Sequence, residues 1–211
     1  IDRVIGGLEK KNKLISPEEK KIVAYHEAGH AITGWFLEHA DPLVKVTIVP
    51  RGVAALGYAQ YLPKDQYLYT TEQLTDSMCM TLGGRASEDL VFGKISTGAQ
   101  NDLERITKLA YGMVTVYGMN SAIGNVSFNN FSQDEFAMGK PYSEKTAEMI
   151  DNEVRKIIDN AYHRTRNLLI EKREQLEQLA QKLLEKEVLF QQDLEEMLGK
   201  RTWGKPTEPT V

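Results

Sequence analysis

A His-Glu-Ala-Gly-His sequence, from His26 to His30, limits the folds open to this chain of 211 residues more than any other segment does. It lies inside a predicted helix, which begins after Ser16 because serine favours the N-cap and Pro17 suits the first helical position. The helix is predicted to end near His39. Because apolar residues surround the motif on nearly every side, we expect the helix to be buried. Its polar side chains then need partners, since unpaired buried polar groups are costly.

The spacing of His26 and His30 favours a metal site. Residues i and i+4 share one face of a helix, with Cβ atoms about 6 Å apart, so two imidazoles can converge on one metal ion. Glu27 is offset by about 100° around the helix axis and would stand beside the metal, where it could take a proton from the water that the metal activates. This pattern is typical of zinc peptidases. The alternative is a pair of hydrogen-bonded core histidines.

A catalytic zinc ion needs a third protein ligand, and the spacing leaves its identity open. His39 follows His30 by nine residues, which is about 180° around a continuous helix, so it is predicted to face away. The extended motif with a third histidine also fails, because Phe36 occupies that position. Acids near later helix and loop boundaries remain as candidates: Glu88, Asp89 and Asp102. The last of these opens a predicted helix after a glycine-containing loop, but it could equally be an ordinary first-turn acid.

The rest of the chain predicts a mainly α-helical fold with a small β element. Strand patterns cover residues 44–49 and 56–62, and a shorter strand-like piece covers residues 126–128. Helical patterns cover about residues 71–84, 85–92, 101–117 and 143–198. The glycine pair at 83–84 is predicted to separate the first two helices, and the last pattern is predicted to break near Lys172 and Glu187.

Composition and charge exclude several classes of protein. The chain has 26 Lys and Arg against 30 Asp and Glu, which argues against a general nucleic-acid binder or a basic membrane-surface helix. No stretch approaches the roughly 18 apolar residues of a membrane span. The single cysteine, Cys79, cannot form an internal disulfide, which favours a reducing compartment. The chain begins at Ile1 without an initiator methionine, so we expect a piece of a larger protein.

Three segments together resemble the peptidase domain of FtsH-type, membrane-anchored AAA proteases. They are His-Glu-Ala-Gly-His at 26–30, Leu-Gly-Gly-Arg-Ala-Ser-Glu at 82–88 and Ser-Thr-Gly-Ala-Gln-Asn-Asp-Leu at 96–103. The residues around the motif, Tyr25 before it and residues 35–42 after it, are most similar to the mitochondrial m-AAA, or paraplegin-like, branch. The resemblance covers about residues 1–199.

The resemblance implies one zinc ion per chain, held by His26, His30 and Asp102, with Glu27 as the catalytic base. It also implies that Glu88 lies near the site as a candidate to hold a ligand in position. The implied fold is mainly α-helical with a small β element beside the site. The implied activity is that of a zinc metalloendopeptidase that degrades unfolded or misassembled polypeptides for protein quality control and processing.

The same resemblance implies how the chain is divided and where it works. Residues 1–15 would be the junction from a missing AAA ATPase module, residues 16–200 the zinc peptidase domain, and residues 201–211 a disordered tail. ATP would bind only in the missing module. Membrane contact would come only through the missing part, so this fragment is expected to be soluble. The implied assembly is a homo- or hetero-hexamer at the mitochondrial inner membrane, with the peptidase facing the matrix.

A threaded substrate must be held extended, and addition to a sheet edge would do this through main-chain hydrogen bonds. We expect residues 56–61 to supply that edge, because their strand pattern follows closely after the motif helix. The residues expected to contact the substrate are Leu56, Gly57, Tyr58 and Ala59. The alternative is a plain structural hairpin.

A structural module is the competing hypothesis for the whole chain. The amphipathic pattern of residues 143–198 would suit a helical ring-former whose peptidase site is vestigial. The intact motif from His26 to His30 argues against this alternative.

Overall fold

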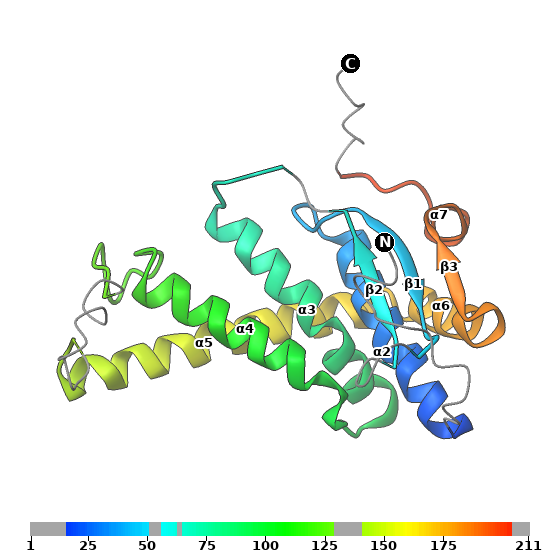
Figure 1. Cartoon of the computed structure of the whole chain (residues 1–211), viewed down its shortest axis with the longest axis horizontal. Coiled ribbons are helices and arrows are strands. Elements are labelled where there is room, and N and C mark those ends of the chain that lie inside the picture. Colours follow the sequence, from blue (N-terminus) through cyan, green and yellow to red (C-terminus); the bar gives the residue numbers. More distant parts are fainter. Residues whose placement is uncertain (1–15, 51–55, 63–64, 129–140, 204–211) are drawn as a thin grey trace, which may run out of the picture.

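The computed structural model of the chain describes residues 16–50, 56–62, 65–128 and 141–203, and these form a mainly helical fold with one small sheet (Figure 1). The helices are α2 (Pro17–Phe36), α3 (Thr71–Phe92), the short 3-10 helix η1 (Thr97–Ala99), α4 (Gln100–Thr115), α5 (Glu144–Glu171), α6 (Arg173–Lys186) and α7 (Gln191–Leu198). The strands are β1 (Leu43–Thr47), β2 (Tyr58–Tyr61) and β3 (Val188–Phe190). The predicted fold class is therefore confirmed. The predicted junction at residues 1–15 and residues 204–211 of the predicted tail lie outside the described residues.

Helix α2 begins where the sequence predicts. The Ser16 hydroxyl accepts a hydrogen bond from the Glu19 backbone N–H, and the Glu19 carboxylate accepts one from the Ser16 backbone N–H. The helix ends at Phe36, earlier than the predicted end near His39, because Leu37 adopts an extended conformation. From Ala24 onward the helix is buried, as its apolar surroundings predict.

Helices α2 and α3 cross at a pair of glycines. A Cβ atom added to Gly29 would lie 2.2 Å from the Gly83 carbonyl oxygen, and one added to Gly83 would lie 2.5 Å from the Gly29 carbonyl oxygen. The predicted break at residues 83–84 is therefore wrong, because α3 runs through Gly83 and Gly84 without interruption. Glycine here permits the close approach of two backbones rather than ending a helix. This crossing presses α3 against the histidine motif.

The sheet is antiparallel in the order β2-β1-β3, so β2 lies at an edge of the sheet as described. Both predicted strands are present, although each is shorter than its pattern. The predicted strand at residues 126–128 is absent, because Phe128 instead donates a backbone hydrogen bond to Thr115 at the end of α4. Strand β3 was not predicted, since three residues between two helices are too few to show a period of two.

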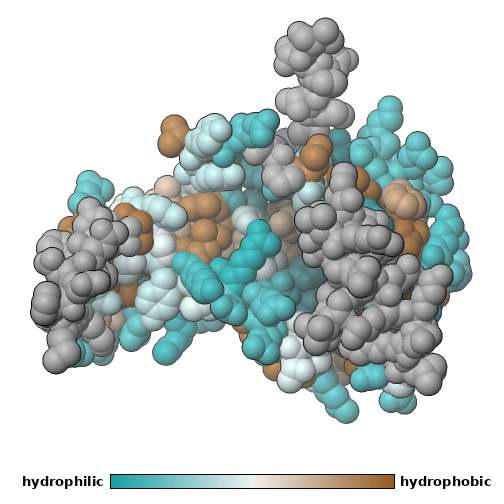
Figure 2. Space-filling model, viewed as in Figure 1, coloured by the Kyte–Doolittle hydropathy of each residue, from teal (hydrophilic) through white to brown (hydrophobic). Residues whose placement is uncertain are grey.

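The helical region after residue 143 breaks as predicted. Helix α5 ends beside Lys172, and α6 ends at Lys186, directly before Glu187, whose φ of 60° is left-handed. Helix α6 packs against α2 on the sheet side of the molecule, while α3, α4 and α5 extend together to the other side (Figure 1). Figure 2 shows hydrophilic side chains gathered over the middle of α4 on this face. Within the described ranges, no helix is both long and apolar enough to span a bilayer.

Candidate metal centre

Three side chains from two distant segments converge on one point. His26 and His30 lie one turn apart on buried α2, and Asp102 lies in the first turn of α4. The two Nε2 atoms are 3.0 Å apart. The Asp102 Oδ2 atom lies 3.3 Å from His26 Nε2 and 3.4 Å from His30 Nε2. Among the three acids that the sequence left open, Asp102 is therefore the one whose carboxylate lies beside the Nε2 atoms of both histidines.

The hydrogen bonds on the far side of each ring fix which nitrogen faces the centre. His30 Nδ1 lies 2.9 Å from the Met80 carbonyl oxygen, which can only accept, so Nδ1 carries the proton. His26 Nδ1 lies 2.6 Å from Glu88 Oε1 and donates to that carboxylate in the same way. In the neutral rings both Nε2 atoms then present lone pairs to each other and to the Asp102 carboxylate. Burial lowers the pKa of His26, but hydrogen bonds with Asp102 and Glu88 raise it overall to about 10, so without a metal a proton joins these acceptors. A divalent cation would replace that proton and satisfy all three acceptors.

The spacing of these atoms fits zinc. Ligand atoms placed tetrahedrally at about 2.0–2.1 Å from a zinc ion lie about 3.3 Å from one another. The three observed separations are 3.0, 3.3 and 3.4 Å. Two imidazole nitrogens and one carboxylate oxygen are also ligands that catalytic zinc commonly uses, with a fourth position left for water or substrate.

Glu27 lies beside this centre rather than in it. Its side chain is buried in the wall of the cavity that the two histidines line, and it is absent from the group of converging ligand atoms. Burial raises the pKa of the Glu27 carboxyl above its ordinary value, although the neighbouring imidazoles oppose that shift. A carboxylate with a raised pKa is a better proton acceptor near neutral pH.

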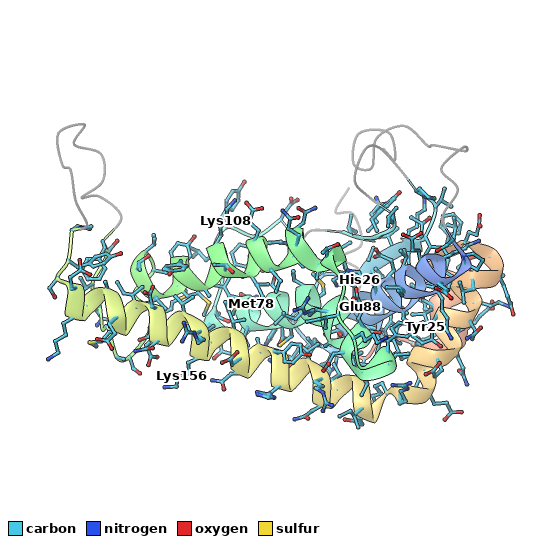
Figure 3. The ribbon with its side chains drawn as sticks, turned by 90° about the horizontal axis from the view of Figure 1, so that it is seen from below. Tyr25, His26, Met78, Glu88, Lys108 and Lys156 are labelled. Atoms are coloured by element: carbon cyan, nitrogen blue, oxygen red, sulfur yellow. The ribbon has the colours of Figure 1, made fainter. Side chains whose placement is uncertain are left out.

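Glu88 connects the histidine motif to the loop that delivers Asp102. One carboxylate oxygen accepts from His26 Nδ1, and the other accepts from the Ser96 backbone N–H at 2.7 Å. Burial alone would raise the pKa of Glu88, but these hydrogen bonds lower it below its ordinary value. His26 and Glu88 lie side by side between α2 and α3 in Figure 3. The carboxylate thus orients the His26 ring and ties it to the segment that leads into η1 and α4.

The remaining predicted residues separate into two groups. The cavity of about 430 Å³ that contains the histidines is also lined by the four residues predicted at the substrate edge, Leu56, Gly57, Tyr58 and Ala59, of which the first two precede strand β2. Asp89 points elsewhere, since its carboxylate accepts from the Tyr162 hydroxyl at 2.9 Å. His39 does not line this cavity and lines a different one.

Two residues that shape the metal centre, Met80 and Gly84, were not predicted from the sequence. Met80 acts through its backbone carbonyl, and a carbonyl leaves no side-chain signature in a sequence. Gly84 makes room for the ligand, because an added Cβ atom would lie 2.4 Å from His26 Nε2. The glycine pair at residues 83–84, inside an otherwise helical pattern, is the sequence signal that could have indicated the role of Gly84. The same pair instead led to the prediction of a helix end.

Comparison with known proteins shows which family the chain resembles. The model of Peptidase family M41 matches residues 13–197. The chain is 64% identical over 211 residues to the ATP-dependent zinc metalloprotease FtsH of Rhodothermus marinus, covering 99% of this chain and 30% of that protein. It is 60% identical over 201 residues to the mouse mitochondrial inner membrane m-AAA protease component AFG3L2, covering 95% of this chain and 25% of that protein. The rice mitochondrial ATP-dependent zinc metalloprotease FTSH 3 is 60% identical over 210 residues, with coverages of 100% and 26%. The chain thus spans between a quarter and a third of the length of these relatives.

Proposed function

The chain belongs to peptidase family M41, and from this premise we propose that it is the zinc endopeptidase domain of an ATP-dependent, membrane-anchored protease. The observation that carries the proposal is the convergence of His26, His30 and Asp102, with Glu27 beside them. A structural module with a vestigial site would not need to keep three metal-binding atoms in this arrangement.

Each residue has a distinct task in the proposed hydrolysis. His26, His30 and Asp102 would hold the zinc ion, which when bound polarises a peptide carbonyl and lowers the pKa of water. Glu27 accepts the proton that the attacking water loses, and it returns a proton to the leaving amine. Glu88 and the Met80 carbonyl hold the two rings so that Nε2, not Nδ1, faces the centre.

The edge of β2 is the proposed binding site for the substrate backbone. As far as the described residues extend, β2 pairs with β1 alone. An extended polypeptide could add to the side of β2 that faces away from β1 and place a carbonyl over the metal-binding atoms, since Gly57, Tyr58 and Ala59 line the same cavity. These main-chain hydrogen bonds do not themselves select a substrate sequence, so any preference would come from side chains that line the cavity.

The wider setting of the domain is proposed from the relatives. We propose that residues 16–200 form the peptidase domain and that an ATPase module and a membrane anchor complete the protein, in a homo- or hetero-hexamer that degrades unfolded or misassembled polypeptides. The mitochondrial names among the relatives support a mitochondrial protein, and we propose the inner membrane with the peptidase facing the matrix. Bacterial FtsH is also among the relatives. Fractionation of the source cells with an antibody to this chain would test the location.

Metal removal tests the proposed activity. Dialysis against a chelator is expected to abolish cleavage of an unfolded polypeptide, because the ligands alone cannot polarise the carbonyl. One equivalent of zinc per chain should restore it. The measurement is the rate of fluorescence increase from a quenched, unfolded substrate, alongside zinc content by elemental analysis. Cleavage that persists in a chain shown to be free of metal would contradict the proposal.

Proline at Tyr58 tests the edge strand. Tyr58→Pro removes one backbone N–H from β2 and is expected to lower kcat/KM for an unfolded peptide about tenfold, the effect of one lost hydrogen bond, while zinc content stays unchanged. Position 57 is less suitable, because a Cβ atom there would lie 2.8 Å from Glu27 Cγ and would disturb the base. The matched control is Tyr58→Val, which keeps the N–H. Equal cleavage by the proline variant and this control would end the edge-strand hypothesis.

A further inference from the structure

A second cavity, of about 450 Å³, adjoins the cavity that His26 and His30 line, here called the metal cleft. Two residues line both cavities and therefore lie at their junction: Met80, whose carbonyl accepts from a metal-binding histidine, and Arg105. A peptide bound over the metal-binding atoms could thus continue past Arg105 into the second cavity.

Arg105 has an unusual electrostatic position. The described residues that line the metal cleft include four acids, Glu19, Glu27, Glu88 and Asp102, and Arg105 is their only lysine or arginine. No carboxylate of the described residues lies within ion-pairing distance of Arg105. A cation that faces a peptide-binding cleft without an acid of its own is available to an acid of the substrate.

Lys108, the other lysine or arginine among the described residues that line the second cavity, has an acid partner within the protein. Lys108 pairs with Glu104 at 2.6 Å and projects from α4 on the side away from α5 (Figure 3). Asp41, the acid that lines this cavity, lies near Arg201 and raises the pKa of that guanidinium, although burial lowers it overall. Arg105 therefore remains the group best placed to attract an anion here.

The distance from the metal-binding atoms to Arg105 defines which substrate residue it would meet. Arg105 follows Asp102 by three residues in α4, a rise of about 4.5 Å along the same face of the helix. An extended peptide advances about 3.3 Å per residue. Gly57, directly before β2, lies beside Glu27, and β2 ends at Tyr61, which lines the same cavity as Arg105. Burial raises the pKa of the Tyr61 phenol, and Arg105 opposes that rise. A substrate along β2 would reach Arg105 one or two residues from the scissile bond.

We propose that Arg105 is a specificity-determining residue that binds a substrate carboxylate one or two residues from the scissile bond. A guanidinium presents two parallel N–H donors that match a carboxylate, so the contact would be bidentate. The carboxylate can belong to an aspartate or glutamate side chain or to a free C-terminus. The inference rests on the proposed peptidase function and gives its substrates an acidic preference.

Matched peptides test this preference. Quenched, unfolded peptides carry either glutamate or glutamine at one of the three positions on each side of the cleaved bond, and a further pair ends in a free acid or an amide. The zinc-loaded wild-type chain is expected to cleave a carboxylate peptide about tenfold faster in kcat/KM than its neutral partner, at one position. Arg105→Gln should bring that ratio close to one, and Arg105→Glu should favour lysine over glutamine at the same position. The control Arg155→Gln removes an exposed arginine of α5 that lines neither cavity and should keep the wild-type ratio.

The outcomes separate this inference from the function on which it rests. Equal rates for every carboxylate and neutral pair, in a wild-type chain that cleaves them, would overturn the role of Arg105 and leave the peptidase intact. A preference that survives Arg105→Gln would also overturn it and would assign the preference to another group. Failure of the zinc-loaded wild type to cleave any peptide would overturn the proposed function, and this inference with it.

Discussion

Glu27→Gln is expected to lower kcat for hydrolysis of an unfolded polypeptide by at least about 100-fold while one zinc ion per chain remains bound. The amide has nearly the same shape as the carboxylate but cannot accept the proton of the attacking water, and general base catalysis contributes about 10²–10⁴-fold. Zinc should stay, because Glu27 is not among the three converging ligand atoms. Single-turnover cleavage and elemental analysis on the same sample measure both quantities.

A matched substitution distinguishes this effect from a general loss of charge. Glu18→Gln changes an exposed glutamate in the first turn of the same helix and should retain wild-type hydrolysis. If Glu27→Gln cleaves at the wild-type rate, Glu27 is not the base. If Glu27→Gln loses zinc together with activity, Glu27 belongs to the metal-binding set and the division of tasks described above is wrong.

Asp102→Ala is expected to weaken zinc binding by more than about 100-fold and to abolish hydrolysis with it. Changes to groups that merely support metal ligands already cost 10–100-fold, so loss of a ligand should exceed that range. The measurement is zinc affinity by competition with a coloured chelator. Asp89→Ala is the matched control, because Asp89 is another of the candidate acids from the sequence but contacts Tyr162 on α5 instead. If Asp102→Ala binds zinc as tightly as the wild type, Asp102 is not the third ligand.

Local sequence rules predicted the motif helix and the two histidines that it places on one face. The cap at Ser16, the proline that follows it and the i, i+4 spacing of His26 and His30 depend on neighbouring residues only, so they are visible without a fold. Strand β3 was missed because its three residues acquire their conformation from pairing with β1, a partner about 140 residues away in the chain.

Sequence spacing alone could not identify the third metal ligand. Asp102 faces the histidines only because η1 turns the chain into α4 and because Glu88 ties the preceding loop to His26. Both are tertiary effects, and spacing alone leaves open whether Asp102 is a ligand or an ordinary first-turn acid. The family resemblance implies Asp102 as the third ligand, and its carboxylate lies 3.3 and 3.4 Å from the two Nε2 atoms. The glycine pair at 83–84 was interpreted wrongly for a related reason, since the need for close helix packing is set by the partner helix.

Zinc K-edge X-ray absorption of the zinc-loaded chain measures directly whether His26, His30 and Asp102 bind zinc. We predict one zinc ion per chain, coordinated by two imidazole nitrogens at about 2.0–2.1 Å with oxygen in the remaining positions. A spectrum that shows fewer than two imidazole ligands, or a sulfur ligand, would contradict the assignment of His26, His30 and Asp102.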